Sequence, residues 1–229
     1  MLTENKFSKY LIYAIGEIVL VVIGILIALQ INNWNEKLKE NTHEQKMLKE
    51  LKSDFSYNKQ ELKRNIEKAT ALISSCDSLI VLFGLNKKIV NPRRVVRLTR
   101  SLSAYSTFDP SNRALNDLLS SGNLNIIKND SIRMQLSRWH GELEDIKEDE
   151  KRLINFGDIQ LNPIRFEYLN YNPKSKLLTN SIELLENRKF ENMVMYISGS
   201  ANYNIENYKY IDIVIDKILN DINDELKSG

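Results

Sequence analysis

One carboxylate lies inside a long apolar run near the N terminus. Residues 10–31 contain Glu17 as their single charged residue. A charged side chain at this depth of a bilayer costs about 3 kcal/mol or more unless it is protonated, paired or turned toward protein. Two kinds of chemistry fit Glu17: a protonated carboxyl that hydrogen-bonds within a homo-oligomer, or a carboxylate that responds to ions or protons in a motor or channel complex. We favour the first interpretation.

Small residues accompany Glu17 at helical spacing. Steps of three and four residues place five side chains on one stripe, which is the predicted membrane-helix interface: Ala14, Glu17, Val21, Gly24 and Ala28. Gly24 and Ala28 form a small-xxx-small pair, which lets two helix backbones approach each other. The stripe therefore predicts self-association or contact with a partner membrane protein.

Four arginines follow one another in a stretch without acids: Arg93, Arg94, Arg97 and Arg100. Guanidinium groups in such a patch could contact an anionic ligand or lipid headgroups. The acidic stretch 142–150 offers intramolecular partners, and paired or solvated charge is the interpretation that we favour. This stretch lacks the glycine turn and alternating oxygen ligands of an EF-hand loop, so we do not expect calcium there.

The remaining reactive residue types are sparse. The chain has one cysteine and two histidines. Cys76 falls on an apolar row, and His140 stands alone beside Trp139 and the acids. Six of the ten tyrosines fall between residues 168 and 210; we interpret them as bundle packing with surface hydroxyls rather than as a ligand pocket. We therefore expect no enzymatic activity, no cofactor and no metal site.

Composition narrows the fold class. Gly (8) and Pro (4) are rare among the 229 residues, which argues against β folds with frequent turns. The net charge of +2 gives no electrostatic footprint for nucleic acid, so we expect no nucleic-acid partner.

The apolar run sets the domain organisation. Residues 10–31 are long enough to cross the hydrocarbon core as a helix, and Tyr10, Tyr13 and Trp34 flank the run as an aromatic belt. The short basic tail, residues 1–9, favours a cytoplasmic N terminus, with the rest of the chain on the periplasmic side. A polar stalk over residues 32–47 and a helical domain over residues 48–229 would follow.

Seven-residue spacing then predicts helices that need one another for burial. An apolar row runs through Leu48, Phe55, Leu62, Ala69, Cys76 and Phe83. Similar rows predict long helices over residues 130–155 and to the C terminus, and Asp109-Pro110 predicts the start of a short helix that ends at Gly122. The fold class is all-α: an N-terminal transmembrane helix continuing into a stalk and an antiparallel helical bundle.

Two segments carry a resemblance. Residues 13–36, YAIGEIVLVVIGILIALQINNWNE, resemble the opening segment of an uncharacterised family of single-pass membrane proteins common in Bacteroidetes. Residues 115–136 are similar to the second recurring segment of that family. The resemblance implies a bacterial inner-membrane location, and it adds no reaction and no catalytic residue.

These features favour a membrane-anchored helical interaction or scaffold protein of the bacterial envelope, in contact with the lipid bilayer. Two alternatives stay open. The bundle could sense a ligand and signal through a partner, or the chain could be a subunit of an ion-driven membrane complex that uses Glu17.

Overall fold

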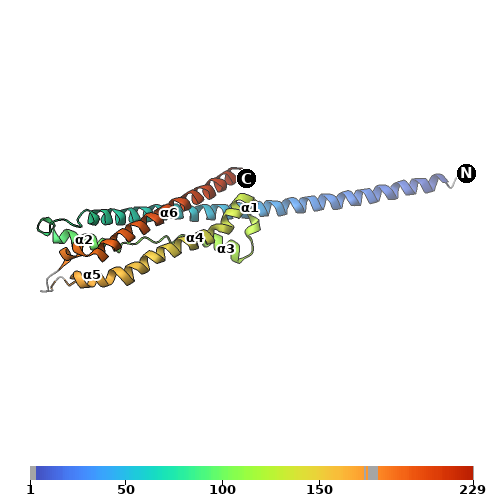
Figure 1. The fold of residues 1–229 in the computed structure, drawn as a ribbon. Helices are drawn as coiled ribbons and strands as arrows, with labels where there is room; N and C mark the ends of the chain where they lie inside the picture. The colour runs from blue at the N-terminus through green and yellow to red at the C-terminus, as the bar shows by residue number, and fades with distance from the viewer. Residues whose placement is uncertain (1–3, 173, 175–179, 229) are drawn as a thin grey trace.

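All regular elements in the described part of the chain are helices. The computed structural model describes residues 4–172, 174 and 180–228, and no strand occurs among them. The chain forms a long rod that carries a bundle at one end (Figure 1). The predicted all-α fold is confirmed. Residues 1–3 of the predicted tail lie outside the described residues.

The first helix, α1, spans Glu4–Ile80 without a break. Its 77 residues correspond to about 115 Å at the standard rise of an α-helix. Residues 10–43 are exposed on every side, and Glu44 is the first buried side chain. The apolar segment, the stalk and the spine of the bundle are therefore parts of one helix.

Two further long helices complete the bundle. Helix α4 spans Asp130–Phe156 and continues through a π-helical turn, Gly157–Leu161, into α5, Asn162–Tyr168. Helix α6 spans Arg188–Ser228 and packs along both α1 and α4. It runs antiparallel to them, whereas α1 and α4 run in the same direction (Figure 1).

The parallel arrangement requires a return connection between α1 and α4. After α1 come a 3-10 helix, Lys87–Ile89, and α2, Pro92–Ser101. An extended segment over residues 104–112, which we call the strap, then runs back along the bundle to α3, Arg113–Ser120. A second 3-10 helix, Leu124–Ile126, leads into α4, and a third, Ser181–Glu186, precedes α6.

The core has two parts along the rod. Near the stalk, Phe55 of α1 packs edge-on against Trp139 of α4, with ring centroids 4.9 Å apart, and α6 closes this part. At the far end, α2 and the region after α4 pack around Cys76 and Phe190. The predicted apolar row is confirmed from Leu48 to Cys76, all at most 3% exposed.

One predicted helix start is wrong. Helix α3 begins at Arg113, not directly after Asp109-Pro110, because the backbone up to Ser111 is held in the strap by side chains of α1. The predicted end is confirmed. Gly122 adopts a φ of 70°, and the Asn123 N–H donates to the Leu118 carbonyl, which is a Schellman end.

Candidate functional site

The predicted membrane interface lies on the uncovered part of α1. Ala14, Glu17, Val21, Gly24 and Ala28 are all exposed, and no described residue bonds to Glu17. A side chain added at Gly24 would meet nothing within 4 Å. The stripe is thus free for a partner helix, and the interface itself stays a prediction.

The arginine cluster lies on α2, at the end of the bundle opposite to the apolar segment (Figure 1). Arg93, Arg97 and Arg100 line an open groove of about 550 Å³ together with Pro92 and Val96. Arg94 is exposed but lies outside this lining. Headgroups of a bilayer that holds residues 10–31 are out of reach of this end, which leaves the anion hypothesis.

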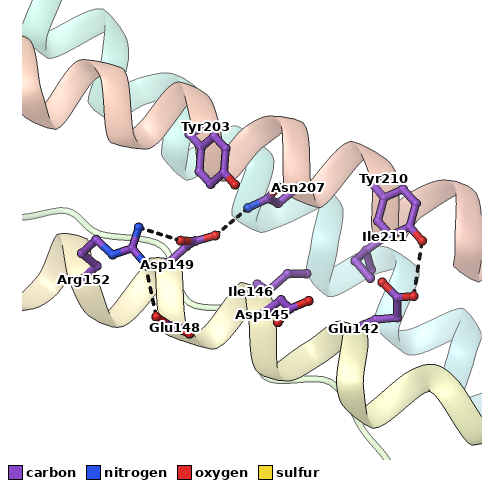
Figure 2. A pocket seen from close by; sticks show the side chains of 10 residues that line it. All are labelled: Glu142, Asp145, Ile146, Glu148, Asp149, Arg152, Tyr203, Asn207, Tyr210 and Ile211. Atoms are coloured by element: carbon purple, nitrogen blue, oxygen red, sulfur yellow. Dashed lines mark hydrogen bonds and ion pairs between the residues drawn. The ribbon is translucent and has the colours of Figure 1, made fainter.

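Two carboxylates of the acidic stretch pair within their own helix, since Arg152 contacts both Glu148 and Asp149. Four of the six carboxylates in this stretch line a groove of about 390 Å³ between α4 and α6 (Figure 2): Glu142, Asp145, Glu148 and Asp149. Asp149 pairs with Arg152 at 3.3 Å and accepts from Asn207 at 3.0 Å. Across the groove, Tyr210 donates to Glu142 at 3.3 Å, and the negative charge of Glu142 raises the pKa of that tyrosine. Within the described residues, none of these acids pairs with the arginines of α2.

One residue of the acidic stretch, Glu150, and one of the six tyrosines, Tyr208, are buried and not solvated. Glu150 (4% exposed) accepts from the Phe108 N–H at 2.8 Å and from the Tyr208 hydroxyl at 2.5 Å. Burial raises the pKa of Glu150, although both donors lower it. Burial and the adjacent carboxylate also raise the pKa of Tyr208. The interpretation of a solvated acidic face is wrong for Glu150, and that of surface hydroxyls is wrong for Tyr208, because the strap covers both.

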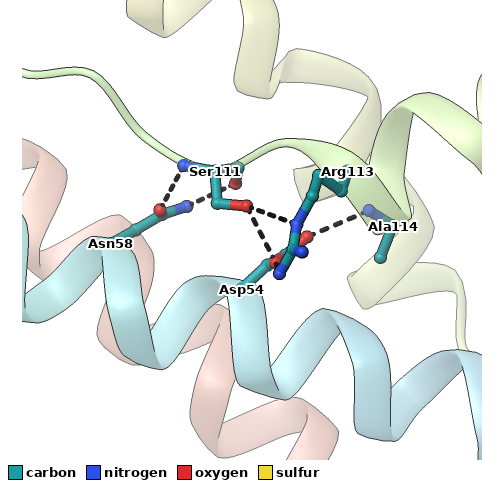
Figure 3. Close-up of polar contacts among 5 residues, drawn as sticks. All are labelled: Asp54, Asn58, Ser111, Arg113 and Ala114. Carbon is teal, nitrogen blue, oxygen red and sulfur yellow. Dashed lines mark hydrogen bonds and ion pairs between the residues drawn. The ribbon is translucent and has the colours of Figure 1, made fainter.

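The strap is held by polar side chains of α1 (Figure 3). Asn58 accepts from the Ser111 N–H at 2.6 Å and donates to its carbonyl at 2.9 Å. Asp54 accepts from the Ser111 hydroxyl and from the Ala114 N–H, both at 2.9 Å. Asp54 therefore caps the N terminus of α3 from another helix. Farther along, Ser106 donates to Asn65 Oδ1 at 2.6 Å.

Sequence reasoning missed these strap contacts, although a signal for them exists. Asn58 and Asn65 fall on the same seven-residue spacing as Leu51 and Leu72, so they occupy core positions of α1. A buried polar residue needs a hydrogen-bond partner. Two asparagines in an apolar row therefore indicate a polar element packed against the helix.

Cys76 lies in the core at the far end of the bundle, whereas His140 lies at the surface of α4. Cys76 is fully buried, and burial raises the pKa of its thiol to about 12, which disfavours the reactive thiolate. The exposed His140 lies with Nε2 3.1 Å from Asn116 Oδ1. Within the described chain, no group of three His, Cys, Asp or Glu residues is arranged to hold a metal ion.

A model for a family of unknown function, DUF6090, matches residues 17–198. The chain belongs to this family. The DUF6090 match begins at Glu17 and extends through the bundle into α6, so it includes the strap and the arginine groove. No curated protein and no solved structure matches the chain. Membership agrees with the expected uncharacterised family, whereas the bacterial group stays a prediction.

Proposed function

We propose that this DUF6090 protein is a membrane-anchored helical interaction or scaffold protein of the bacterial envelope, without catalytic activity. The observation that carries the proposal is the continuity of α1. One helix supplies both an uncovered apolar segment and the spine of the bundle. Such a helix transmits the position and orientation of its anchor directly to the bundle.

The anchor follows from length, apolarity and exposure. Residues 10–31 extend about 33 Å as a helix, close to the thickness of a hydrocarbon core. The most apolar window of the helix has a mean hydropathy of 2.7, and none of it is buried in the bundle. An apolar surface of this size is unfavourable in water, so a bilayer is the environment that suits it.

The stalk sets the distance between membrane and bundle. From Ile31 to Glu44 the helix rises about 20 Å. The far end of the bundle lies about 50 Å beyond that level, near the end of α1 at Ile80. A rigid spacer of this kind suits a protein that presents a surface to partners at a defined height.

We predict that residues 10–31 cross the inner membrane with the bundle in the periplasm. Lys6 and Lys9 beside a short tail favour a cytoplasmic N terminus. Protease added to intact spheroplasts should digest the bundle, whereas a cytoplasmic control protein should survive. Protection of the bundle until lysis would reverse the orientation, and recovery of the full chain in the soluble fraction would remove the anchor.

The scaffold proposal also predicts association through the Glu17 stripe. The stripe ends at Ala28, about 24 Å along the helix before Glu44, the first buried side chain of α1, so the bundle of the same chain does not cover it. Glu17→Leu should weaken association by about 1–2 kcal/mol at most, the value of one interhelical hydrogen bond. Gly24→Ile should also weaken it, because the larger side chain pushes the two helix backbones apart. Glu17→Gln should retain most of it.

Gly16→Ile is the matched control, because it adds the same bulk beside the stripe. A crosslinking or membrane two-hybrid assay measures the association. If Glu17→Leu and Gly24→Ile both associate like the wild type, this face meets lipid. The alternative of an ion-driven complex rests on the exposed Glu17 carboxyl. It predicts that Glu17→Gln keeps association but abolishes any biological output, since an amide does not titrate.

A further inference from the structure

The outward face of α2 forms an organised row of positive charge. Arg93, Arg97 and Arg100 occur at positions i, i+4 and i+7 and line the same groove. The opposite face of α2 is buried through Val95 and Leu98. The helix is therefore fixed in rotation, and its three guanidinium groups remain on the groove side.

Besides the four arginines of α2, an arginine distant in sequence adds a buried charge at the same end of the bundle. Arg165 of α5 is 8% exposed, and its guanidinium donates to neutral acceptors, Ser103 Oγ and Asn162 Oδ1. Its Nε is buried without a hydrogen-bond partner among the described residues. Buried arginines usually pair with carboxylates, since an uncompensated buried charge is costly. No described carboxylate forms an ion pair with Arg165; Asp158 reaches it only through Asn162.

Tyr171 connects the buried arginine to the groove. The guanidinium carbons of Arg100 and Arg165 lie 5.1 Å and 5.8 Å from the centroid of its ring. Arg100 also donates to the Asn170 carbonyl at 3.0 Å, which holds its side chain toward this ring. Arg100 thus belongs both to the groove on α2 and to the cluster around Tyr171. Arg165 does not line the groove, and it adds its positive charge from the other contact on the same ring.

We propose that the groove lined by Arg93, Arg97 and Arg100, with the buried charge of Arg165 nearby, is a binding site for a multivalent oxyanion that carries phosphate or carboxylate groups. The planar guanidinium fork matches both groups and donates two parallel hydrogen bonds to either. Several guanidinium groups without a carboxylate partner favour a ligand with at least two negative charges. The site lies far from residues 10–31, so its ligand is soluble or carried by a partner.

Calorimetric titration of the full-length protein in detergent micelles tests the site. Pyrophosphate and citrate serve as separate probes at constant ionic strength, and binding of one rather than the other identifies the phosphate or the carboxylate source. We expect saturable binding of one equivalent per chain. The double variant Arg97→Gln/Arg100→Gln should weaken it by about tenfold or more, because two charge-assisted contacts are lost.

Arg94→Gln is the matched control. The substitution removes the same kind of charge from an exposed position of the same helix, but Arg94 lies outside the groove. It should change the affinity by less than about twofold, as expected for an exposed charge. If Arg94→Gln weakens binding as much per removed charge as the double variant does, the anion is attracted by the general positive charge of α2 and not by a specific site. Absence of saturable binding of either probe up to about 10 mM would also overturn the proposal.

Discussion

Replacing Asp54 by alanine should lower the free energy of unfolding of the bundle by about 2–4 kcal/mol. Its side chain is 6% exposed and accepts from the Ser111 hydroxyl, the Ala114 N–H and Arg113 (Figure 3). Without the carboxylate, a buried N–H at the start of α3 and the hydroxyl of the strap lose their acceptor. The expected decrease in the free energy of unfolding is large because Asp54→Ala removes both a helix cap and a buried hydrogen-bond acceptor.

Urea unfolding of the full chain in detergent measures this change through Trp139. The indole is fully buried and donates to Asn112 at 2.8 Å, so it reports directly on the start of α3. Trp34 is replaced by phenylalanine in all samples to remove its signal. Asp109→Ala is the control, because Asp109 is the residue at which local sequence would place the cap, and it is exposed. A loss from Asp109→Ala as large as that from Asp54→Ala would contradict the tertiary cap.

Tyr208→Phe should destabilise the bundle by about 1–3 kcal/mol, and by more at neutral than at acidic pH. The change removes only the hydroxyl that donates to Glu150 at 2.5 Å. Ionised Glu150 then loses one of its two donors while it remains buried, whereas protonated Glu150 depends on that donor much less. The pKa of Glu150 should therefore rise further above its ordinary value of 4.5.

The sign of the pH dependence follows from this raised pKa. The folded state holds the Glu150 proton more tightly than the unfolded state does. The stability that the proton contributes is therefore fully present below pH 4.5 and is lost as pH rises through the folded pKa. Asp109 acts in the same direction as burial, and Lys147 acts against it. Unfolding curves from pH 4.5 to 7.5 should show a steeper loss in Tyr208→Phe than in the wild type.

Glu150→Gln separates this group from other titrations. The amide stays neutral throughout the range, so this part of the pH dependence should disappear. Parallel stability profiles for Glu150→Gln and the wild type would show that Glu150 does not titrate between these values.

Local sequence was sufficient for the long helices and for most of their ends, but not for the start of α3 at Arg113. The apolar run in residues 10–31 and the seven-residue row from Leu48 to Cys76 predicted α1. The side chains that one face of a helix buries recur at the period of the helix, so the pattern can be recognised in the sequence. Asn129 stands directly before α4 and caps it, because its side chain accepts from the Ser131 and Ile132 N–H groups. Gly122 was expected to end α3. The capping signals lie within one or two helical turns, and the apolar period repeats along a single helix, so neither depends on distant parts of the chain.

The tertiary structure alone decided where the buried polar groups find partners. Asp54 caps a helix that begins about 60 residues later, and Glu150 meets both the strap and α6. Arg165 reaches the ring that Arg100 also covers. None of these contacts produces a periodic pattern in the sequence. A contact between distant segments depends on the path that the chain takes between them. That path includes the return connection between the parallel helices α1 and α4, whose apolar faces are both buried against α6.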